Sequence, residues 1–183
     1  IDDDKFGSST VPIYQTASFA YDEAEELEAV FAGSRFGHVY SRISNPTVTS
    51  LELRMTAAEG GIGAVAVASG MSCIAGLLFA LTQPGDHLIF SNSLFGGTYY
   101  LLQDLLDQYQ VTVSYVDITQ LDQIRSAITD TTRLIFSEAI GNPKLDVVDI
   151  KAVSAIAGEF GIPFAVDSTL TTPYLLPAKS LGI

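Results

Sequence analysis

An acid and two hydroxyl residues follow one of the apolar stretches of this sequence. Pro163-Phe164-Ala165-Val166 leads directly into Asp167, Ser168 and Thr169. In open α/β sheets, ligands bind outside the carboxyl ends of the strands, and a buried carboxylate stays ionised only beside a cation or hydrogen-bond donors. Asp167 is therefore predicted either to bind a ligand at the end of a buried strand or to cap the turn that follows it, which is a common role for Asp.

Three other loops combine glycine with polar or aromatic residues. A helix that starts after Ala68-Ser69-Gly70-Met71 would offer free N–H groups and a dipole to a phosphate, although a tight turn explains the same residues. Phe95 precedes two glycines, so either a flat ligand stacks on its ring or the ring lies in the core. The segment Glu138-Ala139-Ile140-Gly141-Asn142-Pro143 adds an acid and an amide after another apolar run.

These loops lie between segments that alternate in type. Helical spacing and stop signals predict helices, whereas short β-branched apolar runs predict buried strands. Strands that alternate with helices predict an α/β fold with a mainly parallel sheet covered by helices on both faces. The predicted helices cover residues 22–32, 46 to the Gly60-Gly61 stop, 70–82, 97–109, 119–128 (capped by Thr119) and 149–160, and the predicted strands cover 63–68, 87–91, 111–116, 133–137 and 163–167.

Composition excludes some classes of protein. The 183 residues are 48% hydrophobic and 16% charged, as in a globular protein, and a net charge of −12 argues against nucleic-acid binding. Cys73 is the single cysteine and lies in an apolar run, which predicts a core residue and excludes an internal disulfide. No bilayer-spanning run or secretory signal is present, so we expect no membrane partner and a cytoplasmic location. We predict no metal site.

The two ends favour a piece of a longer chain. The first residue is Ile1 rather than Met, and no closing helix is predicted before Ile183. We expect residues 1–5 to be a tail outside the fold. The domain prediction is an N-terminal arm with a partner-binding loop over residues 1–45, and the N-terminal part of a larger domain over residues 46–183.

One alternative class is a nicotinamide-binding domain. Residues 61–66 fit the pattern G-x-G-x-x-A, and Asp86 follows downstream. That fingerprint should follow a strand and open a helix, whereas here it follows a helix and precedes a predicted strand. A third class, a non-catalytic fragment or binding module, stays open.

Taken in order, these motifs resemble the pyridoxal-phosphate enzymes of the Cys/Met metabolism family from Val11 onward. The resemblance implies a fold-type I large domain of the aspartate-aminotransferase type, an amino-acid substrate, and a dimer or dimer of dimers with shared active sites. It also implies a role for each motif. Tyr40 and Arg42, in the long loop before Asn45-Pro46, would bind the cofactor phosphate of the neighbouring subunit, and the backbone of Ser69, Gly70 and Met71 would bind the phosphate of their own subunit.

The remaining motif residues would surround the cofactor ring. By resemblance, Asp167 pairs with the pyridine nitrogen and Asn142 lies near the phenolic oxygen, while Glu138 and Ser168 belong to the cofactor-binding set. Phe95, assigned with Asp167 to catalysis, occupies a position where the family usually has tyrosine; stacking could persist there without a phenol. An ionised Asp167 would keep the pyridine protonated, which makes the ring a better electron sink.

Within the family, several motifs look most like those of O-acetylhomoserine sulfhydrylases. Methionine γ-lyases usually carry a cysteine where Gly97 stands. The expected activity is therefore γ-replacement on O-acetyl-L-homoserine by sulfide, giving homocysteine for methionine biosynthesis, with cystathionine γ-synthase, cystathionine γ-lyase and methionine γ-lyase as alternatives. The family's Schiff-base lysine, in a Ser-x-Thr-Lys motif, has no match: Lys179 is the only lysine after Asp167, and its surroundings differ. This chain alone is therefore expected to be inactive.

Overall fold

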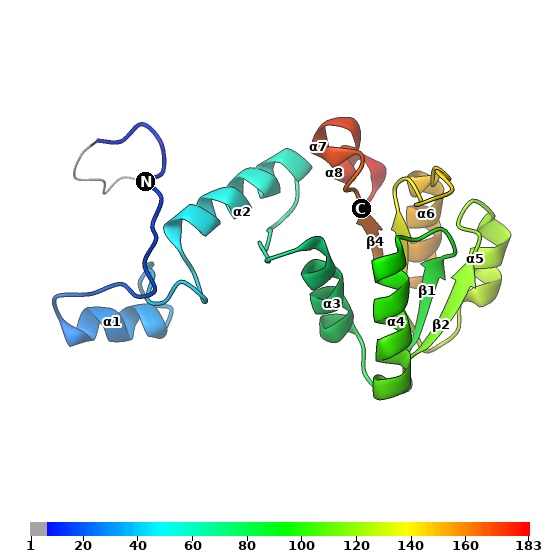
Figure 1. Ribbon diagram of the computed structural model, residues 1–183, viewed down its shortest axis with the longest axis horizontal. Helices are drawn as coiled ribbons and strands as arrows, with labels where there is room; N and C mark the ends of the chain where they lie inside the picture. Colours follow the sequence, from blue (N-terminus) through cyan, green and yellow to red (C-terminus); the bar gives the residue numbers. More distant parts are fainter. Residues whose placement is uncertain (1–6) are drawn as a thin grey trace. The chain divides into compact units, whose positions relative to one another are not determined.

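The structure, a computed structural model, describes residues 7–183, apart from the side chains of residues 105–107. The chain forms two compact units, residues 1–66 and residues 67–183, which are described separately (Figure 1). The functional division predicted between residues 45 and 46 stays a prediction. Among the described helices, none is long and apolar enough to cross a membrane.

The first unit contains two helices, both near the predicted positions. Helix α1 (Ala24–Phe31) has glutamates in its first turn, where their negative charge interacts favourably with the positive end of the helix dipole. Helix α2 (Pro46–Glu59) begins at the predicted cap, because Asn45 accepts a hydrogen bond from the N–H of Thr47 at 2.9 Å. It ends at Gly60, whose φ of 66° lies in the left-handed region that favours glycine.

The second unit is built on a four-stranded parallel sheet in the order β2-β1-β3-β4. All four strands lie within about two residues of their predicted positions. The pairing of β3 with β4 places Glu138 directly beside Asp167 at the carboxyl edge. The strands are β1 (His87–Ser91), β2 (Thr112–Val116), β3 (Thr132–Glu138) and β4 (Phe164–Asp167).

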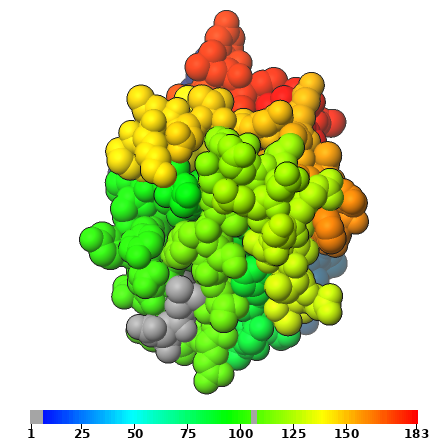
Figure 2. Space-filling view, turned by 90° about the vertical axis from the view of Figure 1, so that its right-hand side faces the viewer, coloured from blue at the N-terminus to red at the C-terminus, as the bar shows by residue number. Residues whose placement is uncertain are grey.

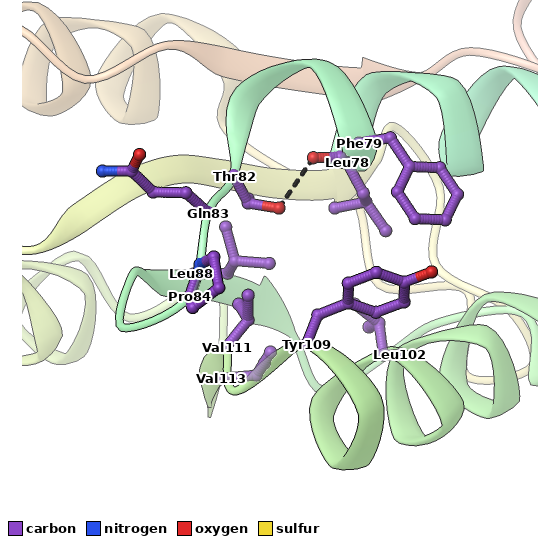
Figure 3. Close-up of a pocket in the computed structure, with 10 residues that line it drawn as sticks. All are labelled: Leu78, Phe79, Thr82, Gln83, Pro84, Leu88, Leu102, Tyr109, Val111 and Val113. Atoms are coloured by element: carbon purple, nitrogen blue, oxygen red, sulfur yellow. Dashed lines mark hydrogen bonds between the residues drawn. The ribbon is translucent and has the colours of Figure 1, made fainter.

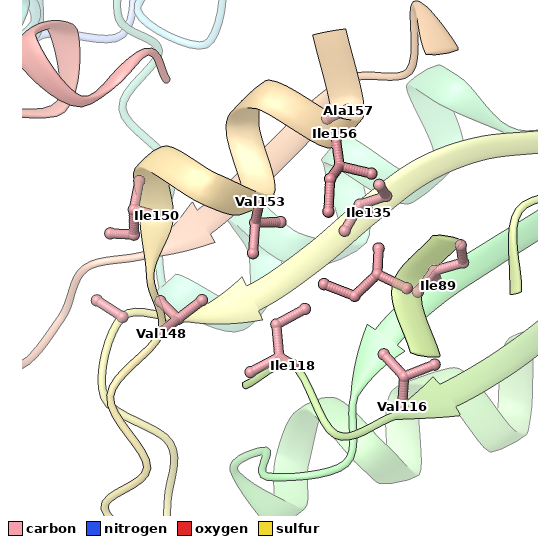
Figure 4. Packing of buried hydrophobic residues seen from close by; sticks show 11 residues of the cluster. Ile89, Val116, Ile118, Ile135, Val148, Ile150, Val153, Ile156 and Ala157 are labelled. Atoms are coloured by element: carbon pink, nitrogen blue, oxygen red, sulfur yellow. The ribbon is translucent and has the colours of Figure 1, made fainter. Parts of the chain in front are cut away.

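Helices cover both faces of this sheet, as the alternating sequence predicts. Alternate strand residues point to opposite faces. Leu88 and Phe90 pack against α3 and α4, while Ile89 packs against α5 and α6 (Figure 4). The four helices are α3 (Gly70–Leu81), α4 (Gly96–Tyr109), α5 (Leu121–Ala127) and α6 (Ile150–Phe160).

The predicted strand over residues 63–68 does not form. Val65 is 81% exposed, and the N–H of Ala66 donates to Glu52 Oε1 at 2.9 Å. No other described strand supplies the hydrogen bonds that a buried strand needs. Because residues 61–66 neither follow a strand nor begin a helix, the nicotinamide-binding fingerprint has no structural support.

Three smaller predictions are also wrong. Cys73 is exposed, because α3 buries Ile74 and Leu78 instead. Helix α5 is capped by Gln120 rather than Thr119, whose N–H and hydroxyl both donate to Asp117. The end of the chain, predicted to lack a helix, contains two short ones, α7 (Thr172–Leu175) and α8 (Ala178–Leu181).

A small apolar cavity of about 50 Å³ lies between α3, α4 and the sheet (Figure 3). Leu78, Leu88 and Leu102 line it, and the hydroxyl of Thr82 donates to the carbonyl of Leu78 at 2.8 Å. Because most of the lining residues are apolar, the cavity is a packing feature rather than a site for chemistry.

Candidate functional site

A pocket of about 400 Å³ opens at the carboxyl edge of the sheet, the edge where ligands of open α/β folds bind. Its lining joins the end of β4 to the start of α3, so Asp167 and Gly70-Met71 face one pocket. The lining residues are Ser69, Gly70, Met71, Ile74, Phe95, Thr98, Glu138, Ile140, Asn142, Asp167, Thr169 and Leu170.

The start of α3 supplies one wall of the pocket. The hydroxyl of Ser69 caps the helix by accepting the N–H of Ser72 at 3.1 Å. The N–H groups of Gly70 and Met71, in the first turn, have no intrahelical partner by the geometry of a helix. Together with the positive end of the helix dipole, they suit an anionic group such as a phosphate.

Phe95 lies at the start of α4 and is 50% exposed, so it is not the core residue of the alternative interpretation. Its ring position depends on Gly97. A Cβ atom at Gly97 would lie 2.6 Å from Cε1 of Phe95 and 3.3 Å from the sulfur of Met71. The ring therefore packs over a residue that has no side chain.

Asp167 is half-buried at the end of β4. Its Oδ1 accepts the N–H of Thr169 at 2.9 Å and the Thr169 hydroxyl at 2.5 Å. The carboxylate thus caps the following turn and also lines the pocket, so the two roles that the sequence left open are compatible.

Glu138 lies beside Asp167 and is only 7% exposed. Oε1 accepts the N–H of Phe95 at 2.5 Å, and Oε2 accepts the N–H of Asn142 at 3.1 Å. Burial raises the pKa of Glu138 above its ordinary value, and the charge of Asp167 raises it further, while the two N–H donors act in the opposite direction.

Three predicted site residues lie outside this pocket. Tyr40 and Arg42 belong to the first unit, where both are exposed and the guanidinium of Arg42 lies 5.3 Å from the centre of the Tyr40 ring. Ser168 does not line the pocket; its carbonyl accepts the N–H groups of Thr171 and Thr172.

The sequence prediction missed five lining residues: Ile74, Thr98, Ile140, Thr169 and Leu170. Thr169 could have been found, because an aspartate side chain often accepts a hydrogen bond from the residue two positions further along the chain. Thr98 had no such signal. Its hydroxyl is fully buried and has no hydrogen-bond partner among the described residues.

The charge of the lining restricts what can bind. It includes two acids, Glu138 and Asp167, and the described lining contains no Lys, Arg or His. No group of three or more metal-ligating side chains occurs among the described residues. A ligand with a protonated ring nitrogen at one end and a phosphate at the other fits an acidic strand end and a helix N-terminus.

This architecture, a parallel α/β sheet with a cofactor-sized pocket at its carboxyl edge, is that of the fold-type I pyridoxal-phosphate enzymes. In a solved structure of a candidate O-acetylhomoserine (thiol)-lyase from Campylobacter jejuni, the matched part superposes with a TM-score of 0.92 at 34% identity. The match covers 98% of this chain and 44% of that one, which carries an N′-pyridoxyl-lysine-5′-monophosphate.

Sequence comparison gives the family. The model of the Cys/Met metabolism PLP-dependent enzymes matches residues 1–183, and the chain belongs to this enzyme family, whose cofactor is pyridoxal phosphate. An O-acetyl-L-homoserine sulfhydrylase of Leptospira meyeri is 40% identical over 92% of the chain, and an L-methionine gamma-lyase of Pseudomonas putida is 41% identical over 98%. The chain spans 38% and 45% of the length of these two relatives.

Proposed function

We propose that the protein is a pyridoxal-phosphate-dependent sulfhydrylase that makes homocysteine from O-acetyl-L-homoserine and sulfide by γ-replacement. The bound cofactor would withdraw electrons from the α-carbon of the substrate and so allow acetate to leave from the γ-carbon. The proposal covers the full-length product of the gene, and includes a cytoplasmic location and assembly as a dimer or dimer of dimers.

The residues of this chain would hold the cofactor at both ends. Asp167 would accept a hydrogen bond from the protonated pyridine nitrogen and keep the proton there. The N–H groups of Gly70 and Met71 would bind the phosphate, with Ser69 holding the turn in place. Phe95 would stack on the ring, and the amide of Asn142 would donate to the phenolic oxygen.

The observation that favours a sulfhydrylase over a methionine γ-lyase is the contact between Gly97 and Phe95. A side chain at position 97 would begin 2.6 Å from the ring of Phe95. The cysteine usual for methionine γ-lyases at this position therefore cannot fit with the ring where it lies. Phe95 also lacks the hydroxyl with which a tyrosine could transfer a proton.

Product analysis of the full-length protein tests this proposal. With O-acetyl-L-homoserine and sulfide we expect homocysteine and acetate, and with L-methionine alone we expect little 2-oxobutanoate or methanethiol. The opposite pattern would assign the protein to the methionine γ-lyases. Replacing sulfide by cysteine in the same assay, with cystathionine as the product sought, distinguishes cystathionine γ-synthase.

A further inference from the structure

The carboxylate of Glu138 connects two loops that come from different strands. Glu138 is the last residue of β3, and its two oxygens accept the N–H of Phe95, after β1, and the N–H of Asn142, after β3. Because each oxygen is occupied by a backbone donor, neither has to be assigned to the cofactor. The side chain is well placed to fix the positions of both loops.

The two loops pack closely, which makes their spacing sensitive to this side chain. A Cβ atom at Gly141 would lie 2.3 Å from Oγ of Ser93 and 3.0 Å from the backbone carbonyl oxygen of Ser93, so the close approach of the two loops requires glycine at position 141. In Figure 2 the yellow segment that includes this loop lies against the green segment that follows β1. Ser93 Oγ has no hydrogen-bond partner among the described residues, and the exposed Lys144 reaches Asn92 only at 3.4 Å. Glu138 thus makes the buried polar link between the loops.

The location of this carboxylate also argues for a role in the site. A buried acid next to a second acid, Asp167, is an unfavourable arrangement for stability alone. Such arrangements concentrate at functional sites. The bonds made by Glu138 hold the backbone of two residues that face the pocket, while Asp167 lies on the neighbouring strand.

We propose that Glu138 is a positioning residue that sets the distance between the Phe95 ring and the Asn142 amide, the two groups that would contact the bound cofactor. This inference rests on the proposed function, since it takes both residues to contact the cofactor. It gives an indirect role to Glu138, which the family resemblance placed in the cofactor-binding set. In this role Glu138 acts through the two backbone N–H groups that it accepts, those of Phe95 and Asn142.

Amide hydrogen exchange in the cofactor-free, full-length protein tests the link itself. Glu138→Gln keeps the size of the side chain but leaves only one oxygen to accept, and Glu138→Ala leaves none. An amide that loses its hydrogen bond to a charged acceptor should exchange its hydrogen about 10- to 100-fold faster. We expect this rise at one of the two amides, Phe95 or Asn142, in Glu138→Gln and at both in Glu138→Ala.

Asp86→Asn is the matched control. Asp86 is equally buried, at 4% exposed, and accepts the N–H of Gln83 at 2.9 Å and Nε of Arg133 at 3.0 Å. It precedes β1, at the amino edge of the sheet, and so lies away from the pocket. We expect this variant to lower the thermal midpoint without changing exchange at Phe95 or Asn142.

Titration with pyridoxal phosphate separates positioning from a merely structural role. We expect Glu138→Gln to bind the cofactor about 10-fold more weakly, with an altered circular-dichroism band of the bound cofactor, and Asp86→Asn to match the wild type.

Unchanged exchange in both Glu138 variants would overturn the link. Increased exchange with wild-type affinity and an unchanged band would overturn the positioning role. A wild-type protein that binds no pyridoxal phosphate would instead refute the proposed function, leaving the exchange result intact. If Glu138→Ala does not fold, the isosteric variant Glu138→Gln alone tests both the link and the positioning role.

Discussion

Single residues of the pocket serve the fold and the proposed chemistry together. Oδ1 of Asp167 bonds both the N–H and the hydroxyl of Thr169. A pyridine nitrogen would therefore take the other oxygen, and the turn would hold the carboxylate in the orientation that this contact needs.

Gly97 provides the sharpest test at the scale of one residue. We expect Gly97→Ala to displace the ring of Phe95, because the new Cβ would lie 2.6 Å from it, and to weaken binding of pyridoxal phosphate about 10-fold. Fluorescence titration of the full-length protein measures the change. Gly96→Ala is the control: a Cβ there meets no atom within 4 Å, so binding should be unchanged. Equal affinities of the two variants would show that the Phe95 ring does not contribute to binding.

His87 predicts a pH dependence of stability. Its ring bonds Oγ1 of Thr132 at 2.8 Å and Oγ of Ser114 at 2.9 Å, and burial lowers its pKa below the ordinary value of about 6.5. Because the folded state then favours neutral His87, the stabilisation is present above about pH 6.5 and is lost as the pH falls through the folded pKa.

The measurement compares thermal midpoints of wild type and His87→Gln between pH 7.5 and 5. The wild type should lose more stability toward acid than the variant, and the comparison at each pH cancels the other titrating groups. His38, whose pKa burial also lowers, is the only other histidine, and His38→Gln shows its separate contribution. Parallel curves for wild type and His87→Gln would contradict the prediction.

At the scale of elements, local signals were sufficient wherever an element is stabilised by its own residues. Asn45-Pro46 and Gly60 define both ends of α2, and Asp149 caps α6 by accepting the N–H of Ala152 at 3.1 Å. Buried strands such as β3 carry a continuous apolar run that predicts them equally well. The assignment of these strands to one parallel sheet followed from their alternation with helices.

The failures have a common cause, which is that the decisive contacts are not local. Residues 63–68 have the apolar pattern of a buried strand, but a strand forms only where neighbours accept its hydrogen bonds. The apolar run around Cys73 did not reveal which side of α3 faces the sheet. The double role of the Glu138 oxygens was equally hidden, because Phe95 lies 43 residues away along the chain.

Asn45 tests whether one residue orders the whole segment around Tyr40 and Arg42. Besides capping α2, its Nδ2 donates to the carbonyl of Tyr14 and to Oγ of Ser41, both at 2.9 Å. We expect Asn45→Ala to cost about 1–2 kcal/mol and to expose the segment to exchange. Asn45→Asp keeps the acceptor but loses both donors. The amides of α2 should therefore stay protected from hydrogen exchange in Asn45→Asp, whereas those around residues 40–42 should lose this protection. Equal protection of both regions in Asn45→Asp would show that the cap alone orders the segment.

For the whole molecule, the lysines determine whether the 183-residue chain can bind the cofactor covalently. None of the described lysines lines the pocket. Lys144 donates to Asn92 at 3.4 Å, Lys151 lies in the first turn of α6, Lys179 lies in α8, and Lys5 lies outside the described residues. We expect borohydride reduction and peptide mapping to find no stoichiometric pyridoxyl-lysine in this chain, but to find one in the full-length protein. A stoichiometric adduct on any of the four lysines would contradict this.

The shared active site is the remaining proposal at this scale. Arg42 and Tyr40 are exposed in the first unit, and the pocket belongs to the second. The described lining of the pocket includes no base to neutralise a phosphate, so a guanidinium from elsewhere would complete the site, and guanidinium groups suit phosphate oxygens. If Arg42 comes from the neighbouring subunit, the protein must be at least a dimer, and light scattering that found an active monomer would refute the arrangement.

Mixing two inactive variants of the full-length protein tests which subunit provides Arg42. In the proposed arrangement Arg42→Ala would damage the neighbour's site and Asp167→Ala its own, so a hybrid dimer would keep one intact site and one site with both defects. Random pairing makes half of the dimers hybrids, and activity should return to about one quarter of the wild-type value. Asp167→Ala mixed with Asn142→Ala is the control, because both residues would act in their own subunit and every dimer lacks an intact site. Recovery in the first mixture alone assigns Arg42 to the partner, whereas no recovery in either would place Arg42 in the site of its own subunit.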